Sequence, residues 1–442
     1  MTVEARSDAL VLFGASGDLA RRKLFPALFE LDRAGRGVPR IVGVATRPWD
    51  DDALRKQARE AIEAGDPSAG GAHLDEFLAR LSYVSGDYRD PTTFDQLAMA
   101  MEGAQRPLSY LAIPPALFDD VVQGLARARL NDGGRVVVEK PFGRDLASAR
   151  ELNACLHRAF PEEAIFRIDH YLGKESVESL LVLRFANVLL EPVWNRQYVA
   201  RVEVTMAESF GVDGRGRFYD DVGALRDVVQ NHLFQIVTLL AMEPPLSADA
   251  DALRDEKVKV LRSMRPLDPA RVVRGQFAGY TDEDGLAERS DTETFVALAM
   301  HVDSWRWADV PFLVRAGKCL PATATEAVVE FHRPPKSLFG DGEGPHPNHL
   351  RFRFGPDDGV TLSLESKAPG EHLVSRTVDL SVSYERALGR RPGAYERLLA
   401  DALDGDPRRF GRADAVEEAW RVVEPVLVNP PPSQSYDPGT WG

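Results

Sequence analysis

Short apolar runs alternate with helical patterns along the first third of the chain, and this alternation is the strongest constraint on the fold. Helical stretches separate most of the runs, and in the first of them Leu24, Leu28 and Leu31 fall on one face. Strands and helices that alternate at this spacing predict a parallel sheet with helices on both faces. The runs with strand character are Asp8–Phe13, Arg40–Ala45, Leu81–Val84, Leu108–Ile113, Arg135–Val138 and Ala164–Ile168.

A glycine-rich turn, GASGDLARRK, joins the first strand to the first helix. Gly14 permits a tight turn, Gly17 lets the backbone approach a pyrophosphate, and Ala20 is small enough for close packing of helix on strand. The helix N-terminus offers free N–H groups and a partial positive charge to phosphates. An ordinary tight turn is the alternative, but the order strand, turn, helix favours a dinucleotide site. Its predicted cofactor-binding residues are Gly14, Ala15, Ser16, Gly17, Asp18 and Leu19.

The end of the second strand bears on the choice of cofactor. Thr46 and Arg47 follow Ala45, and the first acid comes only at Asp50. An acid at this point usually binds the ribose 2′-hydroxyl of NAD, whereas an arginine suits the 2′-phosphate of NADP. The sequence therefore favours NADP. Use of NAD, and a purely solvated Arg47, remain open alternatives.

Two later strands end at prolines. YLAIPP reaches Pro114 and Pro115, and VVVEKPFG places Glu139 and Lys140 at a strand end. Proline cannot continue a ladder, and the residue before it is held extended, so Lys140 has a defined direction. Because α/β enzymes bind their ligands at the carboxyl edge of such sheets, Pro114 is predicted to border the cofactor and Lys140 to lie at the site. A surface lysine is the alternative for Lys140.

The segment RIDHYLGKE follows the last of these strands. Asp169, His170, Tyr171 and Lys174 set an acid, an imidazole, a phenol and an ammonium close together. Three of these side chains can donate hydrogen bonds to an anion, and the carboxylate can orient a base. A solvated helix start is the alternative. The position after a strand favours a site, because α/β enzymes place their sites there.

Beyond about Tyr171 the pattern changes to strands with few helices between them. Val202, Val204 and Met206 alternate with polar residues, which is typical of an antiparallel sheet with one buried face. We therefore expect a large antiparallel sheet backed by helices. Its strand candidates are Ala200–Met206, Phe295–Val302, Phe312–Arg315, Ala327–Phe331, Leu350–Phe354, Val360–Glu365 and Val374–Tyr384, with helices at Glu175–Arg184, Tyr395–Leu403 and Ala415–Val422, a loop at Pro334–Pro347 and a tail at Pro430–Gly442.

One helix in this part, Arg226–Pro245, is apolar nearly all round and is expected to be buried. Its Asp227, Asn231, His232 and Gln235 would each cost roughly 1–3 kcal/mol if left unpaired. So many polar groups in a buried helix predict that it lines a cavity. His232 is the best candidate for a general base, because its reference pKa is close to neutral. A satisfied core histidine is the alternative.

Composition narrows the class of protein. The chain has 442 residues, of which 44% are hydrophobic, so two or three domains with their own cores are expected. Its two cysteines, Cys155 and Cys319, favour a reducing compartment. The net charge of −14 argues against nucleic acid and anionic membranes as partners. Without a signal peptide, a membrane span or a metal-ligand cluster in its sequence, the protein is predicted to be cytoplasmic and to need no metal.

The motifs GASGDLARRK, EKPFG, RIDHYLGKE and RDVVQNHLFQ, in this order and spacing, resemble the glucose-6-phosphate dehydrogenase family over nearly the whole chain. The resemblance implies an α/β Rossmann domain at 1–170 and a larger α+β domain at 171–442, whose mainly antiparallel sheet forms a dimer interface. It implies an oxidoreductase that oxidises glucose 6-phosphate at C1 to 6-phosphogluconolactone with hydride transfer to NADP. This is the first step of the oxidative pentose phosphate pathway. A homodimer or homotetramer is expected.

The resemblance also implies roles for individual residues. His232 is the base that takes the proton of the 1-hydroxyl, and Asp169 orients it. His170, Tyr171 and Lys174 hold the 6-phosphate. Lys140 reaches both the sugar and the nicotinamide of the cofactor. The remaining substrate contacts are Glu208, Asp227 and Lys318.

The chain departs from the family pattern at two places. Thr323 stands where the family commonly has a basic residue near the phosphate, and Thr46 stands where many NADP-using members have arginine. The exact hexose phosphate and the preference between NADP and NAD therefore remain open. Two rival functions are a related Rossmann-type sugar dehydrogenase with another substrate, and a non-catalytic assembly relative. The presence of both Asp169 and His232 disfavours the second.

Overall fold

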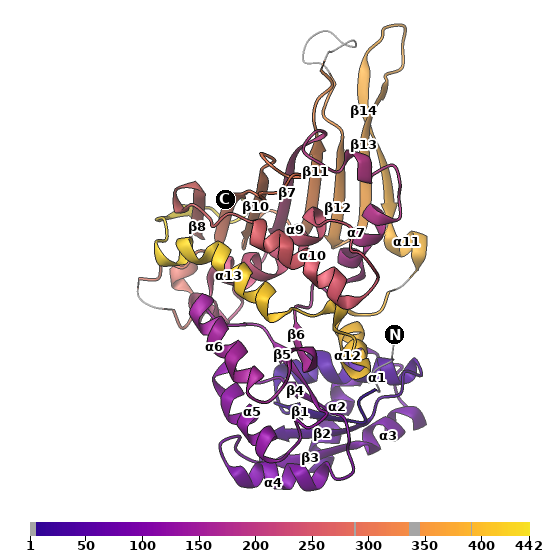
Figure 1. Ribbon diagram of the computed structural model, residues 1–442, viewed down its shortest axis with the longest axis vertical. Coiled ribbons are helices and arrows are strands. Elements are labelled where there is room, and N and C mark those ends of the chain that lie inside the picture. Colours follow the sequence, from indigo (N-terminus) through magenta and orange to yellow (C-terminus); the bar gives the residue numbers. More distant parts are fainter. Residues whose placement is uncertain (1–5, 287–288, 336–344, 390) are drawn as a thin grey trace.

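The computed structural model describes residues 6–286, 289–335, 345–389 and 391–442, which form two sheets (Figure 1). The first sheet has six parallel strands in the order β3-β2-β1-β4-β5-β6, which confirms the predicted parallel sheet. The order reverses direction between β1 and β4, and such a switch point opens a crevice at the carboxyl ends of the strands. The strands are β1 (Ala9–Phe13), β2 (Arg40–Ala45), β3 (Leu81–Ser85), β4 (Pro107–Leu111), β5 (Arg135–Glu139) and β6 (Ile165–Ile168).

Helices cover both faces of this sheet, as its nearly continuous apolar strands require. Three of the helices begin at an aspartate, Asp50, Asp90 or Asp145, whose side chain accepts a hydrogen bond from a backbone N–H of the first turn. The helical segments are η1 (Ala20–Leu24), α1 (Phe25–Arg33), α2 (Asp51–Gly65), α3 (Ala72–Ala79), α4 (Pro91–Ala100), η2 (Pro115–Leu117), α5 (Phe118–Arg127), α6 (Leu146–His157) and η3 (Glu162–Ala164).

The second sheet has nine strands in the order β14-β13-β12-β11-β7-β10-β9-β8-β15. Most neighbours are antiparallel, but β7 pairs with β10, and β8 with β15, in parallel. Val202 and Val204 are fully buried, as their alternation predicts. The strands are β7 (Val199–Ala207), β8 (Val272–Phe277), β9 (Phe295–Met300), β10 (Phe312–Gly317), β11 (Ala324–Phe331), β12 (His349–Gly355), β13 (Gly359–Lys367), β14 (Ser375–Ser383) and β15 (Ser433–Tyr436).

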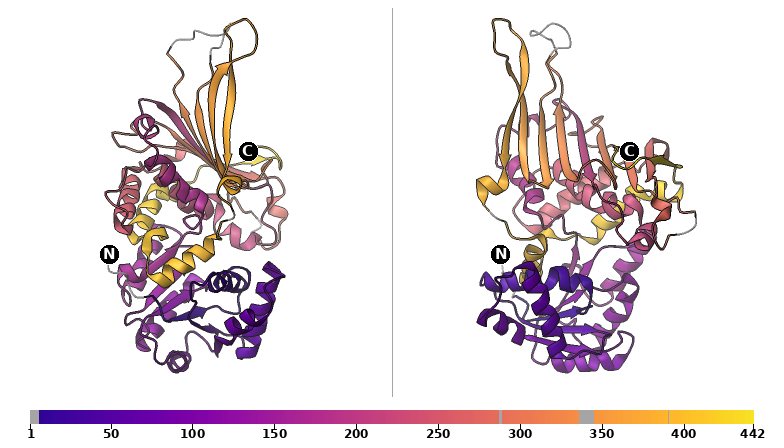
Figure 2. Two further views of the ribbon diagram at one scale, coloured as in Figure 1. Left: turned by 90° about the vertical axis from the view of Figure 1, so that its right-hand side faces the viewer. Right: turned by 180° about the vertical axis from the view of Figure 1, so that it is seen from behind.

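Helices lie along one face of this sheet, and the long strands β13 and β14 project past them (Figure 2). The apolar helix expected over Arg226–Pro245 begins as a π-helix, η5 (Leu225–Leu233), and continues as α9 (Phe234–Ala241) in the centre of the core. The other helical segments are α7 (Glu175–Phe185), η4 (Glu191–Val193), α8 (Gly216–Asp220), α10 (Ala250–Ser263), η6 (Pro269–Arg271), η7 (Tyr280–Asp282), α11 (Tyr384–Leu388), α12 (Ala394–Asp404), η8 (Pro407–Arg409) and α13 (Ala413–Val428).

The structure corrects one expectation about the C-terminal end. The tail predicted over Pro430–Gly442 is wrong in part, because β15 pairs with β8 and buries Tyr436. Its partner β8 also lacked a sequence signal. The sequence pattern missed both strands because edge pairing depends on a neighbour distant in the chain. The loop expected at Pro334–Pro347 lies largely outside the described residues.

One helix from the end of the chain belongs to the core of the first sheet. Leu398, Leu399 and Leu403 of α12 pack with residues of α1, and Figure 1 shows the two helices side by side. The domain boundary predicted between residues 170 and 171 stays a prediction. The helix α12 follows this boundary in the sequence but packs against the part of the chain that precedes it. In the described part of the chain, no helix is long and apolar enough to cross a membrane.

Candidate active site

The glycine-rich turn is pressed against the neighbouring strand end. Gly14 has a φ of +78°, and a Cβ at this position would lie 2.2 Å from the carbonyl oxygen of Ala112. The Gly14 N–H donates to the Val44 carbonyl, and the Gly17 N–H donates to the Gly14 carbonyl. A helix starts directly after the turn, and the first N–H groups of a helix have no partner within it. The turn therefore fits the pyrophosphate of a dinucleotide, and glycine at position 14 lets it pack closely against the end of β4.

The loop after β2 is held in a defined position. The Arg47 carbonyl accepts hydrogen bonds from the Tyr83 hydroxyl (2.9 Å) and the Ser85 hydroxyl (3.0 Å). The exposed Arg47 guanidinium lies 5.3 Å from the ring centroid of Trp49. Thr46 is exposed beside it. The sequence analysis did not identify Trp49 and Tyr83, which belong to no motif. Trp49 contacts the guanidinium of Arg47, and Tyr83 binds its carbonyl.

Other predicted cofactor residues lie at the same edge of the sheet. Pro114 is exposed and precedes the short helix η2. The Asp18 carboxylate is exposed and pairs with Arg21 and Arg22. The Ala112 N–H donates to the Phe13 carbonyl, which joins the end of β4 to the start of the glycine-rich turn.

His232 and Asp169 are in direct contact although they come from distant parts of the chain. Asp169 follows β6, His232 comes from η5, and the His232 Nδ1 lies 2.5 Å from the Asp169 Oδ1. That carboxylate oxygen also accepts a hydrogen bond from the Tyr171 N–H at 3.0 Å. Both side chains are buried. The geometry gives the neutral imidazole an Nδ1 proton and leaves the lone pair on Nε2, as a base oriented by a carboxylate requires.

Lys140 occupies the free side of this imidazole. Its Nζ lies 2.9 Å from the His232 Nε2, and it donates to the Asp227 carbonyl at 2.8 Å and to the Asp227 Oδ1 at 3.2 Å. A group that approaches the His232 lone pair therefore also meets the Lys140 ammonium and the Asp227 carboxylate. Together with Asp169, three segments far apart in the sequence converge here.

Burial and neighbouring charges adjust the basicity of the pair. Burial lowers the pKa of His232, against an opposing effect of Asp169, and the Lys140 charge lowers it further. Burial by itself opposes ionisation of Asp169, but the charge of His232 and its hydrogen bond hold the pKa of Asp169 well below its usual range. At neutral pH the aspartate is thus charged and the imidazole neutral, which is the state in which His232 accepts a proton.

The predicted phosphate ligands surround the base. His232 stacks on Tyr171 with ring centroids 4.4 Å apart, and its centroid lies 4.5 Å from that of His170. The Lys174 Nζ lies 4.1 Å from the Tyr171 ring centroid and donates to the Phe354 carbonyl at 3.3 Å. Burial lowers the pKa of His170 to about 3, so this imidazole is neutral when no anion is present.

Glu208 and Lys318 form a second pair in the site. The Lys318 Nζ donates to the Glu208 Oε2 at 2.5 Å and lies 5.1 Å from the ring centroid of Tyr219. Charge from Lys318 contributes to lowering the pKa of Asp227, after the opposing effect of burial and the larger effect of Lys140. Thr323 does not supply a charge, and its hydroxyl instead accepts a hydrogen bond from the Ser209 N–H at 3.0 Å. It anchors the loop that follows Glu208.

The structure adds a polar cluster that the sequence pattern did not show. Glu139, one residue before Lys140, is half-buried and accepts a hydrogen bond from the Tyr110 hydroxyl at 2.5 Å. Tyr395 of α12 also hydrogen-bonds Glu139 and stacks on His170, with centroids 6.4 Å apart. Burial raises the pKa of Glu139 to about 7. The contribution of Tyr395 depends on the packing of α12 and had no local signal.

The structure brings together three side chains that could in principle hold a metal ion, a grouping that the spacing of these residues in the sequence did not indicate. Ligand atoms of Asp169, His170 and His232 lie within 4.8 Å of one another. The Asp169–His232 contact already uses the Nδ1 of the imidazole, which leaves this group better suited to proton transfer than to coordination. The expectation of a metal-free site stays a prediction.

The fold and the candidate site together define a dinucleotide-dependent oxidoreductase. The model of the glucose-6-phosphate dehydrogenase NAD binding domain matches residues 11–179, and that of the C-terminal domain of the same family matches residues 181–442. The chain therefore belongs to the glucose-6-phosphate dehydrogenase family and uses a nicotinamide dinucleotide cofactor.

Individual relatives agree over the full length. The chain is 47% identical to glucose-6-phosphate 1-dehydrogenase 1 of Mycobacterium tuberculosis, covering 99% of this chain and 93% of the relative. It is 42% identical to the Dickeya dadantii glucose-6-phosphate 1-dehydrogenase, covering 100% and 96%. The crystal structure of the Mycobacterium avium enzyme matches with a TM-score of 0.92 at 46% identity, covering 99% and 95%. A structure of a glucose-6-phosphate dehydrogenase in complex with its substrate glucose-6-phosphate matches with a TM-score of 0.92 at 36% identity, covering 100% and 96%.

Proposed function

We propose that the protein oxidises glucose 6-phosphate at C1 to 6-phosphogluconolactone and passes the hydride to NADP. The observation that carries this proposal is the buried His232, held by Asp169 at Nδ1 and facing Lys140 at Nε2. An oxidation of a hemiacetal carbon needs a base for the hydroxyl proton, and this imidazole is oriented and neutral at working pH. Family membership supplies the substrate class.

His232 removes the proton of the 1-hydroxyl through Nε2. The incoming hydroxyl takes the place beside Nε2 that Lys140 occupies at 2.9 Å. Lys140 then donates to the substrate oxygen while it remains paired with Asp227. The Asp169 carboxylate stabilises the imidazolium that forms, since opposite charges in a buried site attract strongly.

The phosphate and the sugar hydroxyls bind to different groups. His170, Tyr171 and Lys174 hold the 6-phosphate, and its negative charge favours protonation of the half-buried His170. Lys318, Glu208 and Asp227 donate to or accept from the sugar hydroxyls. This division places C1 at His232 and directs the phosphate toward Lys174.

The cofactor binds along the carboxyl edge of the first sheet. The turn from Gly14 to Leu19 holds its pyrophosphate, Thr46 and Arg47 bind the ribose 2′-phosphate, and Pro114 and Lys140 border the nicotinamide. When bound, the nicotinamide ring supplies the acceptor for the hydride. Arg47 favours NADP over NAD, because a guanidinium pairs with a phosphate more strongly than with a hydroxyl.

One assay tests this proposal directly. Nicotinamide reduction is followed by absorbance with glucose 6-phosphate or glucose, and with NADP or NAD. Fast turnover with glucose 6-phosphate and NADP is expected, and slow turnover with glucose. Equal rates with glucose would contradict the assigned phosphate site and favour a related sugar dehydrogenase.

We further propose a homodimer formed through the second sheet, with a homotetramer as the larger alternative. Val378, Leu380 and Val382 lie on one face of the edge strand β14 and are 42%, 59% and 45% exposed. Such a row of exposed apolar side chains on an edge strand is typical of a protein interface. Sedimentation analysis of the wild type and of Leu380→Asp tests this proposal. The variant should shift to monomers, and a wild-type protein that is itself monomeric would contradict the proposal.

A cytoplasmic location also remains a prediction.

A further inference from the structure

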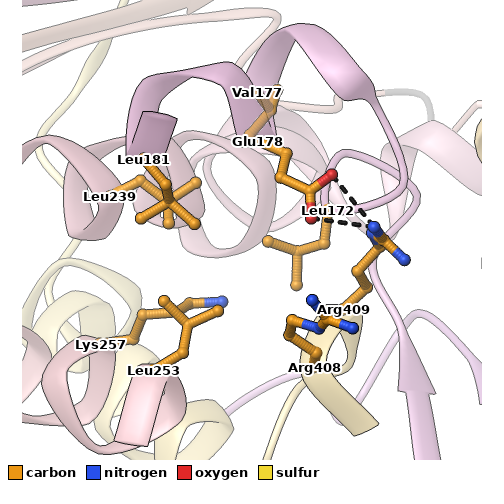
Figure 3. A pocket seen from close by; sticks show the side chains of 9 residues that line it. All are labelled: Leu172, Val177, Glu178, Leu181, Leu239, Leu253, Lys257, Arg408 and Arg409. Carbon is orange, nitrogen blue, oxygen red and sulfur yellow. Dashed lines mark hydrogen bonds and ion pairs between the residues drawn. The ribbon is translucent and has the colours of Figure 1, made fainter. Parts of the chain in front are cut away.

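A small cavity lies beside the turn that carries the candidate phosphate ligands, and Leu172 of that turn is part of its wall (Figure 3). Its walls come from α7, α9, α10 and η8. It measures about 20 Å³ as the space open to the centre of a water molecule. Such a space holds one or two waters, or one monatomic ion. Its lining residues are Leu172, Val177, Glu178, Leu181, Leu239, Leu253, Lys257, Arg408 and Arg409.

Lys257 projects into this cavity without a partner. Its side chain is only 4% exposed, and Figure 3 shows its nitrogen directed toward the wall that carries Leu172 and the two arginines. Among the described residues, none forms a hydrogen bond or ion pair with it. Burial lowers the pKa of Lys257 to about 8; the charge of Asp169 opposes this effect, and the charge of Arg254 adds to it. A buried ammonium without a partner is expensive, so the cavity calls for a counter-charge.

The other lining groups cannot supply this counter-charge. Glu178 is the acid in the wall, and both of its oxygens accept hydrogen bonds from Arg409, at 3.0 and 3.1 Å. Arg397 also donates to it. The Nε of Arg409 is buried and has no hydrogen-bond partner. Among the described lining side chains, the wall therefore offers hydrogen-bond donors on cations without a partner, and no carboxylate that is free to accept. The rest of its surface is apolar.

We propose that this cavity is a binding site for a monatomic anion, chloride under ordinary conditions, held by Lys257 with Arg408 and Arg409 nearby. The size of the cavity excludes phosphate and larger oxyanions, and the surplus of donors excludes a cation. The cavity is not lined by the candidate phosphate ligands His170, Tyr171 and Lys174. Leu172, in the middle of the turn that carries them, forms part of its wall.

Bromide in crystals locates the anion directly. Bromide replaces chloride chemically and gives an anomalous signal. Crystals of the wild-type protein grown with sodium bromide should show an anomalous peak in the cavity, within hydrogen-bond distance of the Lys257 Nζ. A cavity without anomalous density, in crystals that hold bromide elsewhere, would overturn the proposal.

A solution measurement tests the same site without crystals. The melting temperature is followed as sodium chloride replaces sodium gluconate at constant ionic strength. A ligand that binds the folded state raises the melting temperature. A rise is expected for the wild type and for the control Lys259→Met, which changes a lysine 62% exposed on the same helix. It should vanish in Lys257→Met, and an equal rise in both variants would overturn the assignment of Lys257.

Discussion

The two sides of the crevice are built in different ways. The proposed dinucleotide side consists mainly of backbone: glycines at a tight turn, N–H groups at a helix start, and the exposed loop that contains Arg47. The proposed substrate side consists of buried and half-buried polar side chains from η5 and from the ends of β5 and β6, with contacts of 2.5–3.2 Å between them. Backbone sites tolerate changes of side chain, whereas a buried charge network depends on each member. Substitutions should therefore have their largest effects on the substrate side.

Removal of the base should have the largest effect. His232→Asn should lower kcat by about 10²–10⁴-fold, because general base catalysis contributes that much. The substrate KM should change little, since the phosphate contacts remain. Steady-state kinetics with glucose 6-phosphate check this, with His73→Asn, a half-exposed histidine in the first domain, as the matched control. Near wild-type turnover of His232→Asn would remove the residue from the mechanism.

Replacing Asp169, the carboxylate partner of His232, should change the pH dependence of kcat/KM. The pKa of His232 lies below its ordinary value of 6.5, so the acid limb of kcat/KM should lie below that pH in the wild type. Protonation at lower pH removes the base. Asp169 raises the pKa of His232, so Asp169→Asn should move the limb to still lower pH while the plateau rate falls. A limb that moves to higher pH would contradict the assigned charges.

Loss of a phosphate contact should be the next largest effect. Lys174→Ala should raise the KM for glucose 6-phosphate about 10- to 100-fold, since a hydrogen bond to a charged group contributes roughly 1.5–3 kcal/mol. Oxidation of glucose should hardly change. Lys56→Ala, a lysine 78% exposed on α2, is the control. An equal loss with glucose would show that Lys174 supports the fold instead of the phosphate.

A methyl group added to the glycine-rich turn tests the backbone side. Gly14→Ala places a Cβ 2.2 Å from a carbonyl oxygen, so the turn must shift, and the KM for the cofactor should rise about tenfold for a strain of roughly 1–3 kcal/mol. Gly35→Ala is the control that distinguishes the steric clash at Gly14 from the backbone strain of a positive φ. Gly35 also has a positive φ of +72°, but a Cβ there meets no atom within 4 Å. Equal effects of the two substitutions on cofactor KM would contradict a specific role of the turn.

The exposed arginine should have the smallest effect. Arg47→Ala should lower kcat/KM for NADP about fivefold, the upper range for an exposed charge pair, and leave NAD nearly unchanged. Kinetics with both cofactors check this, and the NAD measurement serves as the internal control. An equal loss with NAD and NADP would mean that Arg47 only supports its loop and that the 2′-phosphate is bound elsewhere.

Local patterns were sufficient for the first sheet and for the motif residues. Each of its strands is a short apolar run, and the predicted strand positions agree with the structure within two residues at either end. The strands β8 and β15 were missed, because their pairing joins segments far apart in the chain. Tyr395 was missed for the same reason, since α12 returns from the end of the chain to pack against the first domain.

The sequence by itself determined the kinds of groups in the site: a glycine-rich phosphate turn, an acid and an imidazole, and three lysines in an acidic protein. Local periodicity and residue chemistry carry that information over a few residues. Only the tertiary structure decided which nitrogen of His232 faces Asp169, that Lys140 lies against the other, and that Lys257 is buried without a partner. These arrangements depend on contacts between distant segments, and burial at those contacts adjusts the pKa values on which the chemistry depends.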